Sequence, residues 1–306
     1  MQHAEATPRA TERPAVHERW LSANGLTQHV LSWGDEQARE TVVLCHGFLD
    51  LAWGFAELGP RLAAEGYRVL AADFRGHGES GRVSPDGYYY FPDYVLDLHE
   101  LLPQLIDGSF HLLGHSMGGT VSTMYAATHP ERIRSLCLVE GLGPNAESPE
   151  RSLGRLQSWL EQAPRARAKP PAVLRDLDDA FARLTARHVG VEPSFLRMLA
   201  EKSTAPHPGG EGLCWRFDPL HRTSSPLPFD RARFMQCLGN ISAPTLVIQG
   251  EHGFRGKDHD ERSAQLVHVR QATVAGAGHM THWSQCEAVA ALLLEHIGTH
   301  VVSSAV

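Results

Sequence analysis

The sequence predicts an α/β fold: a doubly wound, mostly parallel sheet with helices on both faces and a helical cap inserted after its sixth strand. Short runs that are apolar at every position alternate with amphipathic stretches of helical period, and such runs suit strands that are buried on both faces. The order strand, helix, strand, helix is typical of a parallel sheet with crossover helices. The third observation is that this alternation stops between residues 144 and 239, where helical patterns follow one another without a buried strand.

The expected elements follow in chain order. Residues 1–16 mix charges, prolines and small residues without an apolar cluster, so we expect a disordered tail that is neither a signal peptide nor a membrane anchor. Asn24 and Gly25 then separate two short strands as the turn of a hairpin. The apolar runs that predict buried strands are 41–47, 68–76, 110–116, 135–141, 245–250 and, more weakly, 272–279. The helical stretches between them are 55–66, 94–107 and 121–133.

The break in the alternation divides the chain into a core, residues 17–143 and 240–306, and a helical cap, residues 144–239. The cap is inserted between two strands of the sheet. We therefore expect it to fold over the carboxyl edge of the sheet, where open α/β sheets bind ligands. Residues 215–229, which include Arg216, His221 and Arg222, are expected to pin the cap to the core, and the alternative is that they hold a polar or anionic group of the substrate.

Composition narrows the range of partners. The chain has 306 residues, a net charge of −7 and a pI near 6.2, which gives no basic surface for nucleic acid or for anionic membranes. No segment is apolar for long enough to span a bilayer. The five cysteines are scattered and lack the close pairs of metal sites, so we expect free thiols in a reducing cytoplasm. We expect a small-molecule substrate as the partner, with no cofactor and no metal.

The strongest motif is "HLLGHSMGG", in which Gly114, Ser116 and Gly118 form the pattern G-x-S-x-G. It directly follows an apolar run and directly precedes a helical stretch, which is the context that a nucleophile elbow requires. The strand must turn sharply into the helix with Ser116 at the apex, and only small neighbours fit such a turn. The motif therefore predicts a nucleophilic serine.

Together with three further segments, this motif resembles the α/β-hydrolase superfamily, and the resemblance extends over nearly the whole chain after the tail. "LCHGFLD" resembles the oxyanion loop of the family, "AADFRGHGESG" resembles the turn after its fourth strand, and "GAGHMTHW" resembles the loop that carries its catalytic histidine. The "HGFLD" loop also resembles the serine hydrolase-like branch of the superfamily, which can carry its acid after the sixth strand.

The resemblance implies roles for individual residues. Ser116 needs a base to take its proton and return it to the leaving group, and His279 is expected in that role. His282 lies close by in the sequence and is expected to serve packing. The tetrahedral oxyanion is expected to be held by the backbone N–H groups of Phe48 and Met117.

The acid of the expected triad is not where the family usually has it. The usual aspartate follows the next-to-last strand, and this sequence has Gly253 at that position. The base still needs a carboxylate to fix its tautomer and to stabilise its charge. Glu140 is the expected acid, because dehalogenase-like members place theirs after the sixth strand and because a charge that ends an apolar strand is costly unless it is paired. Asp258, Asp260 and Glu251 remain alternatives, as does a chain without a working acid.

The reaction expected from this set is hydrolysis of a carboxylic ester or lactone through an acyl-enzyme on Ser116. A serine at this position argues against the branches of the family that attack with aspartate. The alternatives are a non-hydrolytic ligand-binding protein, a cofactor-free perhydrolase and a carbon-carbon bond hydrolase. The aromatic run Tyr88–Tyr94 is expected to begin a helix rather than to contact a ligand. The residues expected to form an apolar substrate pocket are Leu49, Trp53, Leu142, Trp159 and Trp215.

Overall fold

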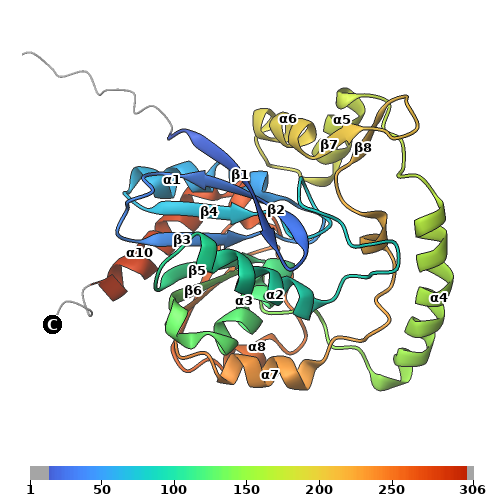
Figure 1. Cartoon of the computed structure of the whole chain (residues 1–306). Coiled ribbons are helices and arrows are strands. Elements are labelled where there is room, and N and C mark those ends of the chain that lie inside the picture. Colours follow the sequence, from blue (N-terminus) through green and yellow to red (C-terminus); the bar gives the residue numbers. More distant parts are fainter. Residues whose placement is uncertain (1–13, 302–306) are drawn as a thin grey trace, which may run out of the picture.

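The computed structural model describes residues 14–301, in which one eight-stranded sheet is covered by helices on both faces (Figure 1). The strands of this sheet are β1 (Val16–Ala23), β2 (Leu26–Trp33), β3 (Thr41–Cys45), β4 (Arg68–Ala72), β5 (Phe110–His115), β6 (Ile133–Val139), β9 (Thr245–Gly250) and β10 (Val269–Val274). Their order across the sheet is β1-β2-β4-β3-β5-β6-β9-β10. The strands from β4 to β10 pair in parallel, whereas β2 is antiparallel to both of its neighbours. The predicted fold class is confirmed.

The hairpin at the edge of the sheet forms as its turn residues predict. Asn24 and Gly25 have φ values of 48° and 72°, and two consecutive residues of positive φ are the signature of the turn that matches strand twist. β1 begins at Val16, so the predicted tail reaches one residue too far into the described chain. Residues 1–13 of that tail lie outside the described residues.

The helices separate into two layers and a cap. They are α1 (Leu58–Ala64), α2 (Phe91–Leu101), α3 (Met117–Thr128), α4 (Ser152–Ala168), α5 (Leu177–Arg187), α6 (Pro193–Lys202), α7 (Arg231–Gly239), α8 (His259–Ser263), α9 (Thr281–Ser284) and α10 (Cys286–Val301). On one face of the sheet, α1 and α10 bury their apolar residues, and on the other α2, α3 and α7 do so. The central strands are therefore apolar on both sides, which explains their uninterrupted hydrophobic runs.

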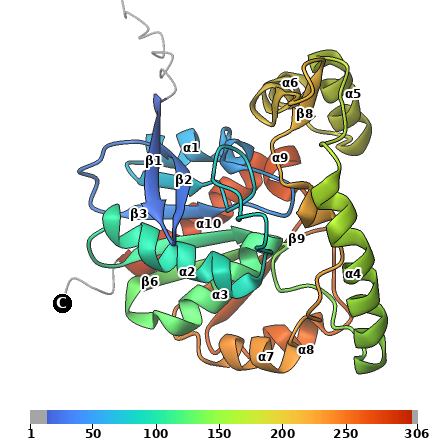
Figure 2. The ribbon, with the colours of Figure 1, turned by 45° about the vertical axis from the view of Figure 1, so that its right-hand side comes forward.

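The cap lies to one side of the sheet and consists of α4, α5, α6 and a small hairpin of β7 (Thr204–Pro206) and β8 (Leu213–Trp215) (Figure 2). The predicted end of the cap at residue 239 is wrong, because α7 lies inside that range and packs against α3 in the core. Phe234 and Leu238 of α7 are fully buried there. The chain thus returns to the core before α7, which serves as the crossover helix into β9.

The segment after β8 holds the cap on the core. The Asp218 N–H donates to the Gly76 carbonyl at 2.7 Å, and the Asp218 carboxylate accepts from the Tyr89 hydroxyl at 2.7 Å. The ring of His221 stacks on those of Tyr89 and His77, with centroids 3.9 and 4.1 Å away. These contacts agree with the expectation that residues 215–229 pin the cap.

Within the described chain, no helix is both long and apolar enough to cross a membrane. All five cysteines lie in that part of the chain, and none of them forms a disulfide.

Candidate active site

Ser116 occupies a sharp turn between β5 and α3. Its φ and ψ of 50° and −115° lie outside the regions that ordinary residues prefer, which is the strain expected at a nucleophile elbow. The neighbouring glycines provide room for it. A Cβ at Gly118 would overlap the carbonyl groups of Cys45 and His46, and a Cβ at Gly114 would come within 2.5 Å of the Gly118 carbonyl oxygen.

His279 reaches Ser116 from the loop after β10. Its Nε2 lies 3.0 Å from the Ser116 Oγ, and its Nδ1 lies 3.2 Å from the Glu140 Oε2. The His279 side chain remains 40 % exposed, whereas that of Glu140 is fully buried. The structure therefore brings the three residues expected to form a triad into one hydrogen-bonded chain.

Glu140 directly follows β6 and is held at both ends by β9 and its loop. Its backbone N–H donates to the Ile248 carbonyl at 2.9 Å, and its φ of 52° turns the side chain out of the strand direction. The two carboxylate oxygens accept from the N–H groups of Gly250 and Phe254, at 2.6 and 2.5 Å. These two backbone donors hold the carboxylate beside His279 Nδ1.

Gly253 explains why this carboxylate fits. A Cβ at position 253 would overlap both carboxylate oxygens of Glu140. The glycine at the usual position of the acid thus leaves the space that the Glu140 carboxylate occupies.

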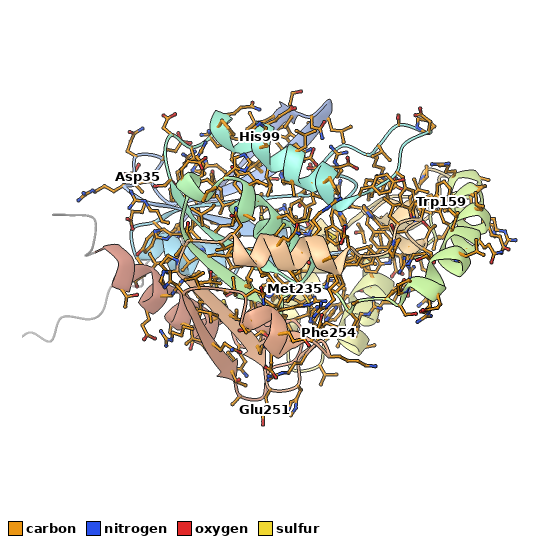
Figure 3. All side chains as sticks on the ribbon, turned by 90° about the horizontal axis from the view of Figure 1, so that it is seen from below. Asp35, His99, Trp159, Met235, Glu251 and Phe254 are labelled. Carbon is orange, nitrogen blue, oxygen red and sulfur yellow. The ribbon has the colours of Figure 1, made fainter. Side chains whose placement is uncertain are left out.

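The alternative acids have other partners. Asp258 pairs with Arg231 and Arg262, at 2.7 and 2.9 Å, and Asp260 pairs with Arg255. Glu251 accepts from the Gly276 N–H and points away from the body of the molecule (Figure 3). None of the three contacts His279 in the described structure, so the structure does not bring them into the site.

The loop after β3 is braced from behind by buried polar groups. His46 Nε2 accepts from the Phe74 N–H at 2.8 Å, and its Nδ1 donates to the Gly47 carbonyl at 2.7 Å. Burial lowers the pKa of His46, which keeps the ring neutral and preserves this donor and acceptor pattern. Asp73 accepts from the Ala52 N–H at 2.6 Å and so ties the far end of the loop to β4.

This bracing fixes the two amides expected to hold an oxyanion. The Leu49 N–H donates to His77 Nε2 at 3.3 Å, and Leu49 has a φ of 59°, which turns the chain at this point. In the described chain, no group accepts from the Phe48 N–H. Met117 begins α3, so its N–H has no acceptor within the helix. Phe48 and Met117 both line the same cavity as Ser116.

Comparison with known proteins decides the family. A family profile described as the alpha/beta hydrolase fold matches residues 40–285. This chain is an α/β-hydrolase. A serine hydrolase-like protein of Dictyostelium discoideum is 24 % identical over 276 residues, which cover 86 % of this chain and 76 % of that protein. The sn-1-specific diacylglycerol lipase ABHD11 of Mus musculus is 27 % identical over 79 % of this chain and 75 % of its own length.

A solved structure supports the same assignment. The thioesterase domain from the curacin biosynthetic pathway superposes with a TM-score of 0.81 and 28 % identity, over 92 % of this chain and 99 % of that domain. The chain is therefore similar to serine hydrolase-like members of the α/β-hydrolase family, and these relatives support a hydrolase.

The α/β-hydrolase core and its cap line an open cavity of about 1500 Å³ beside the serine. Its lining is mostly apolar, and a run of aromatic residues forms one wall. Besides Ser116 and His279, the lining includes Tyr88, Tyr90, Phe91, Thr120, Met124, Phe229 and Phe234. The expectation for Tyr88–Tyr94 was half right: Tyr90 caps the start of α2, but the run also faces the cavity.

The five residues expected to form the pocket do not line this cavity, so that prediction is wrong. Leu142 is buried in the core, and the Leu49 side chain does not reach the lining. Trp53 and Trp215 pack inside apolar clusters of the core and the cap. Trp159 packs on the outer side of the aromatic run, on α4 and away from Phe254 (Figure 3). The apolar side chains of a cap helix point toward the surface on which the helix packs. Helical spacing alone does not identify that surface.

Proposed function

We propose that this protein hydrolyses a carboxylic ester or lactone with an apolar part through an acyl-enzyme on Ser116. The observation that carries the proposal is the chain of hydrogen bonds from Ser116 through His279 to Glu140, which opens onto a largely apolar cavity. Similarity to a lipase and to a thioesterase domain supports acyl transfer as the reaction class.

In the first half of the proposed reaction, Ser116 Oγ attacks the acyl carbon while His279 Nε2 takes the hydroxyl proton. The carbonyl oxygen gains the negative charge, and the N–H groups of Phe48 and Met117 donate to it. The tetrahedral intermediate then collapses. The bond to the alcohol oxygen breaks, and His279 returns the proton to that oxygen, which leaves an ester on Ser116.

In the second half, water replaces the alcohol. His279 takes one proton from the water as its oxygen attacks the acyl carbon, and it later returns that proton to Ser116 Oγ. The carboxylic acid is released and the serine is restored. The Glu140 carboxylate accepts a hydrogen bond from His279 Nδ1 and stabilises the imidazolium in both halves.

The cavity supports a substrate larger than a short-chain ester. Its volume of about 1500 Å³ exceeds the range of about 300–1,000 Å³ that is usual for small-molecule sites. Met117, Thr120 and Met124 line it from one face of α3 and span about 10 Å along the helix. An apolar chain that enters beside Ser116 would lie along this face.

Unpaired cysteines also fit a reducing cytoplasm as the place of action.

The test is pre-steady-state hydrolysis of p-nitrophenyl esters of increasing acyl length. The wild type should release a burst of p-nitrophenol that matches the enzyme concentration if deacylation is slow. Ser116→Ala should lose the burst and at least about 10³-fold in kcat/KM. A fluorophosphonate should add one covalent mass to the wild type and none to Ser116→Ala.

The acid is tested by Glu140→Gln against a double variant, Asp258→Asn with Asp260→Asn. Glu140→Gln should approach the loss of Ser116→Ala, whereas the double variant should keep near wild-type kcat. A wild type that binds apolar esters but neither turns them over nor reacts with the phosphonate would contradict the proposal and favour a binding protein.

A further inference from the structure

Three buried ligand-type side chains meet beneath the loop that carries Phe48. Asp50 comes from that loop, His115 from the end of β5, and His282 from α9, just after the loop of His279. Their exposed fractions are 6 %, 1 % and 1 %. One donor atom from each lies within 4.8 Å of the other two. None of the three takes part in the proposed acyl transfer.

The polar atoms at this junction have no hydrogen-bond partners in the described structure. Asp50 Oδ2, His115 Nδ1 and both ring nitrogens of His282 are buried and unpaired. His115 Nε2 lies 3.0 Å from the His279 carbonyl oxygen and must donate to it, which leaves an unprotonated lone pair on Nδ1. A buried carboxyl oxygen and a buried imidazole lone pair thus lie close together at this junction. Buried acceptors without a donor or a cation are costly.

Two glycines make room for these groups. A Cβ at Gly47 would come within 2.7 Å of His115 Nδ1, and a Cβ at Gly54 would come within 2.6 Å of Asp50 Oδ1. That second oxygen accepts from the Leu51 N–H at 2.8 Å, which holds the carboxylate in its present orientation. The loop backbone therefore accommodates the donors closely rather than leaving them in a loosely packed gap.

We propose that Asp50, His115 and His282 bind one divalent first-row transition-metal ion, with Zn²⁺ the best match. Two imidazole nitrogens and one carboxylate oxygen form a donor set that suits Zn²⁺, whereas Mg²⁺ and Ca²⁺ prefer oxygen alone. In a tetrahedral zinc site with bonds of about 2.1 Å, the ligand atoms lie about 3.4 Å apart. Donors now at most 4.8 Å apart reach that spacing when each moves by less than about 1 Å.

A water molecule would complete the tetrahedron, and because the ion would touch none of the reacting groups its role would be structural. The ion would join the loop of Phe48, the strand that ends at Ser116 and the segment after His279, so that the three parts of the reaction site share one fixed point. The competing occupant is a single water molecule, which could donate to Asp50 and His115 and accept from His282. The experiment has to distinguish a bound zinc ion from a bound water molecule.

The chain is expressed without a polyhistidine tag in zinc-supplemented medium, desalted, and analysed for metal by mass spectrometry. The wild type should retain close to one equivalent of Zn²⁺. Asp50→Asn and His282→Phe should each retain less than about a tenth of that. A double variant, His99→Asn with His129→Asn, removes a surface histidine pair from α2 and the end of α3 and should retain the wild-type amount.

A second measurement does not depend on the stability of the variants. Wild-type protein refolded with Co²⁺ should show visible d–d absorption of four- or five-coordinate cobalt, and its melting temperature should fall when a chelator removes the ion. A metal content below a tenth of an equivalent together with no cobalt band would overturn the proposal and leave a water molecule at the junction. Equal metal retention by the wild type and by folded Asp50→Asn would also overturn it.

Discussion

Gly253→Ala is the most direct perturbation of the proposed acid, because it leaves the triad residues themselves unchanged. The φ of Gly253 lies outside the left-handed region, so alanine adds no backbone strain there. Its Cβ would instead overlap both carboxylate oxygens of Glu140. Glu140 must then rotate away or the loop must shift, and either change breaks the contact with His279 and the bonds from the Gly250 and Phe254 amides.

The magnitude follows from what the carboxylate does. Loss of the acid in a serine triad lowers kcat by about 10⁴-fold, or about 5 kcal/mol in the barrier. One methyl group displaces the carboxylate incompletely, so we expect kcat to fall by about 10²- to 10³-fold. The buried Gly250 amide loses its acceptor as well, which should lower the free energy of unfolding by about 1–3 kcal/mol.

The assay is kcat for p-nitrophenyl butyrate, with circular dichroism melts to confirm folding. Gly256→Ala is the matched control, because it lies in the same loop and its added Cβ would come no closer than 3.3 Å to any neighbour. It should change kcat by less than about threefold. A second test moves the acid: Glu140→Gly with Gly253→Asp should recover at least about tenfold over Glu140→Gly alone, since glycine readily adopts the positive φ at position 140.

A folded Gly253→Ala protein with wild-type kcat would refute this reasoning. It would mean that the carboxylate of Glu140 is not needed where it lies, and that the glycine has no bearing on the acid. If only the double variant Glu140→Gly with Gly253→Asp fails to recover activity, that result is weaker evidence against the reasoning, because aspartate at position 253 must also find its own amide donors.

Three other variants test the cavity and the attachment of the cap. Met124→Trp should narrow the far end of the cavity and lower kcat/KM for long acyl esters about tenfold, while acetate esters change less than about twofold in the same chain-length series. Burial lowers the pKa of His221 to about 4 from 6.5, so the unfolded chain binds more protons between these values and stability falls as the pH falls. Between pH 6.5 and pH 5 this group lowers the wild-type free energy of unfolding by about 1–2 kcal/mol, and His221→Phe should abolish that part of the pH dependence, as measured by urea unfolding at both pH values. Asp218→Ala removes the acceptor of the buried Tyr89 hydroxyl, so the free energy of unfolding should fall by about 2 kcal/mol and cleavage in the cap by a dilute protease should accelerate.

Features that depend on local chemistry could be predicted from the sequence. The Asn24–Gly25 turn requires positive φ at two successive residues, and few residue pairs allow it. The central strands are buried on both faces, so their apolar runs identify them whatever packs on them. The elbow around Ser116 needs small residues at fixed offsets, so the motif can be recognised in the sequence.

Features that depend on tertiary packing could not be predicted in this way. α7 has the same amphipathic pattern as a cap helix, and no strand separates it from the cap in the sequence. The sequence pattern therefore does not predict that α7 packs against α3. The prediction of the pocket residues was wrong for the same reason, since Trp159 and Trp215 bury their rings within or beside the cap. The junction of Asp50, His115 and His282 joins residues far apart in the chain, without the short spacing that identifies many metal sites.

The position of the proposed acid depends both on local chemistry and on tertiary packing. β6 and β9 are neighbours in the sheet, with Val139 paired to Ile248, so a residue that follows either strand starts from nearly the same edge. A carboxylate can therefore approach His279 from either strand, but the two possible side chains compete for one space. Glutamate at position 140 and glycine at position 253 are the two halves of a single arrangement. Because β9 and its loop supply the amides that bind the Glu140 carboxylate, the proposed acid is attached to β6 while its hydrogen-bond partners lie on β9 and its loop.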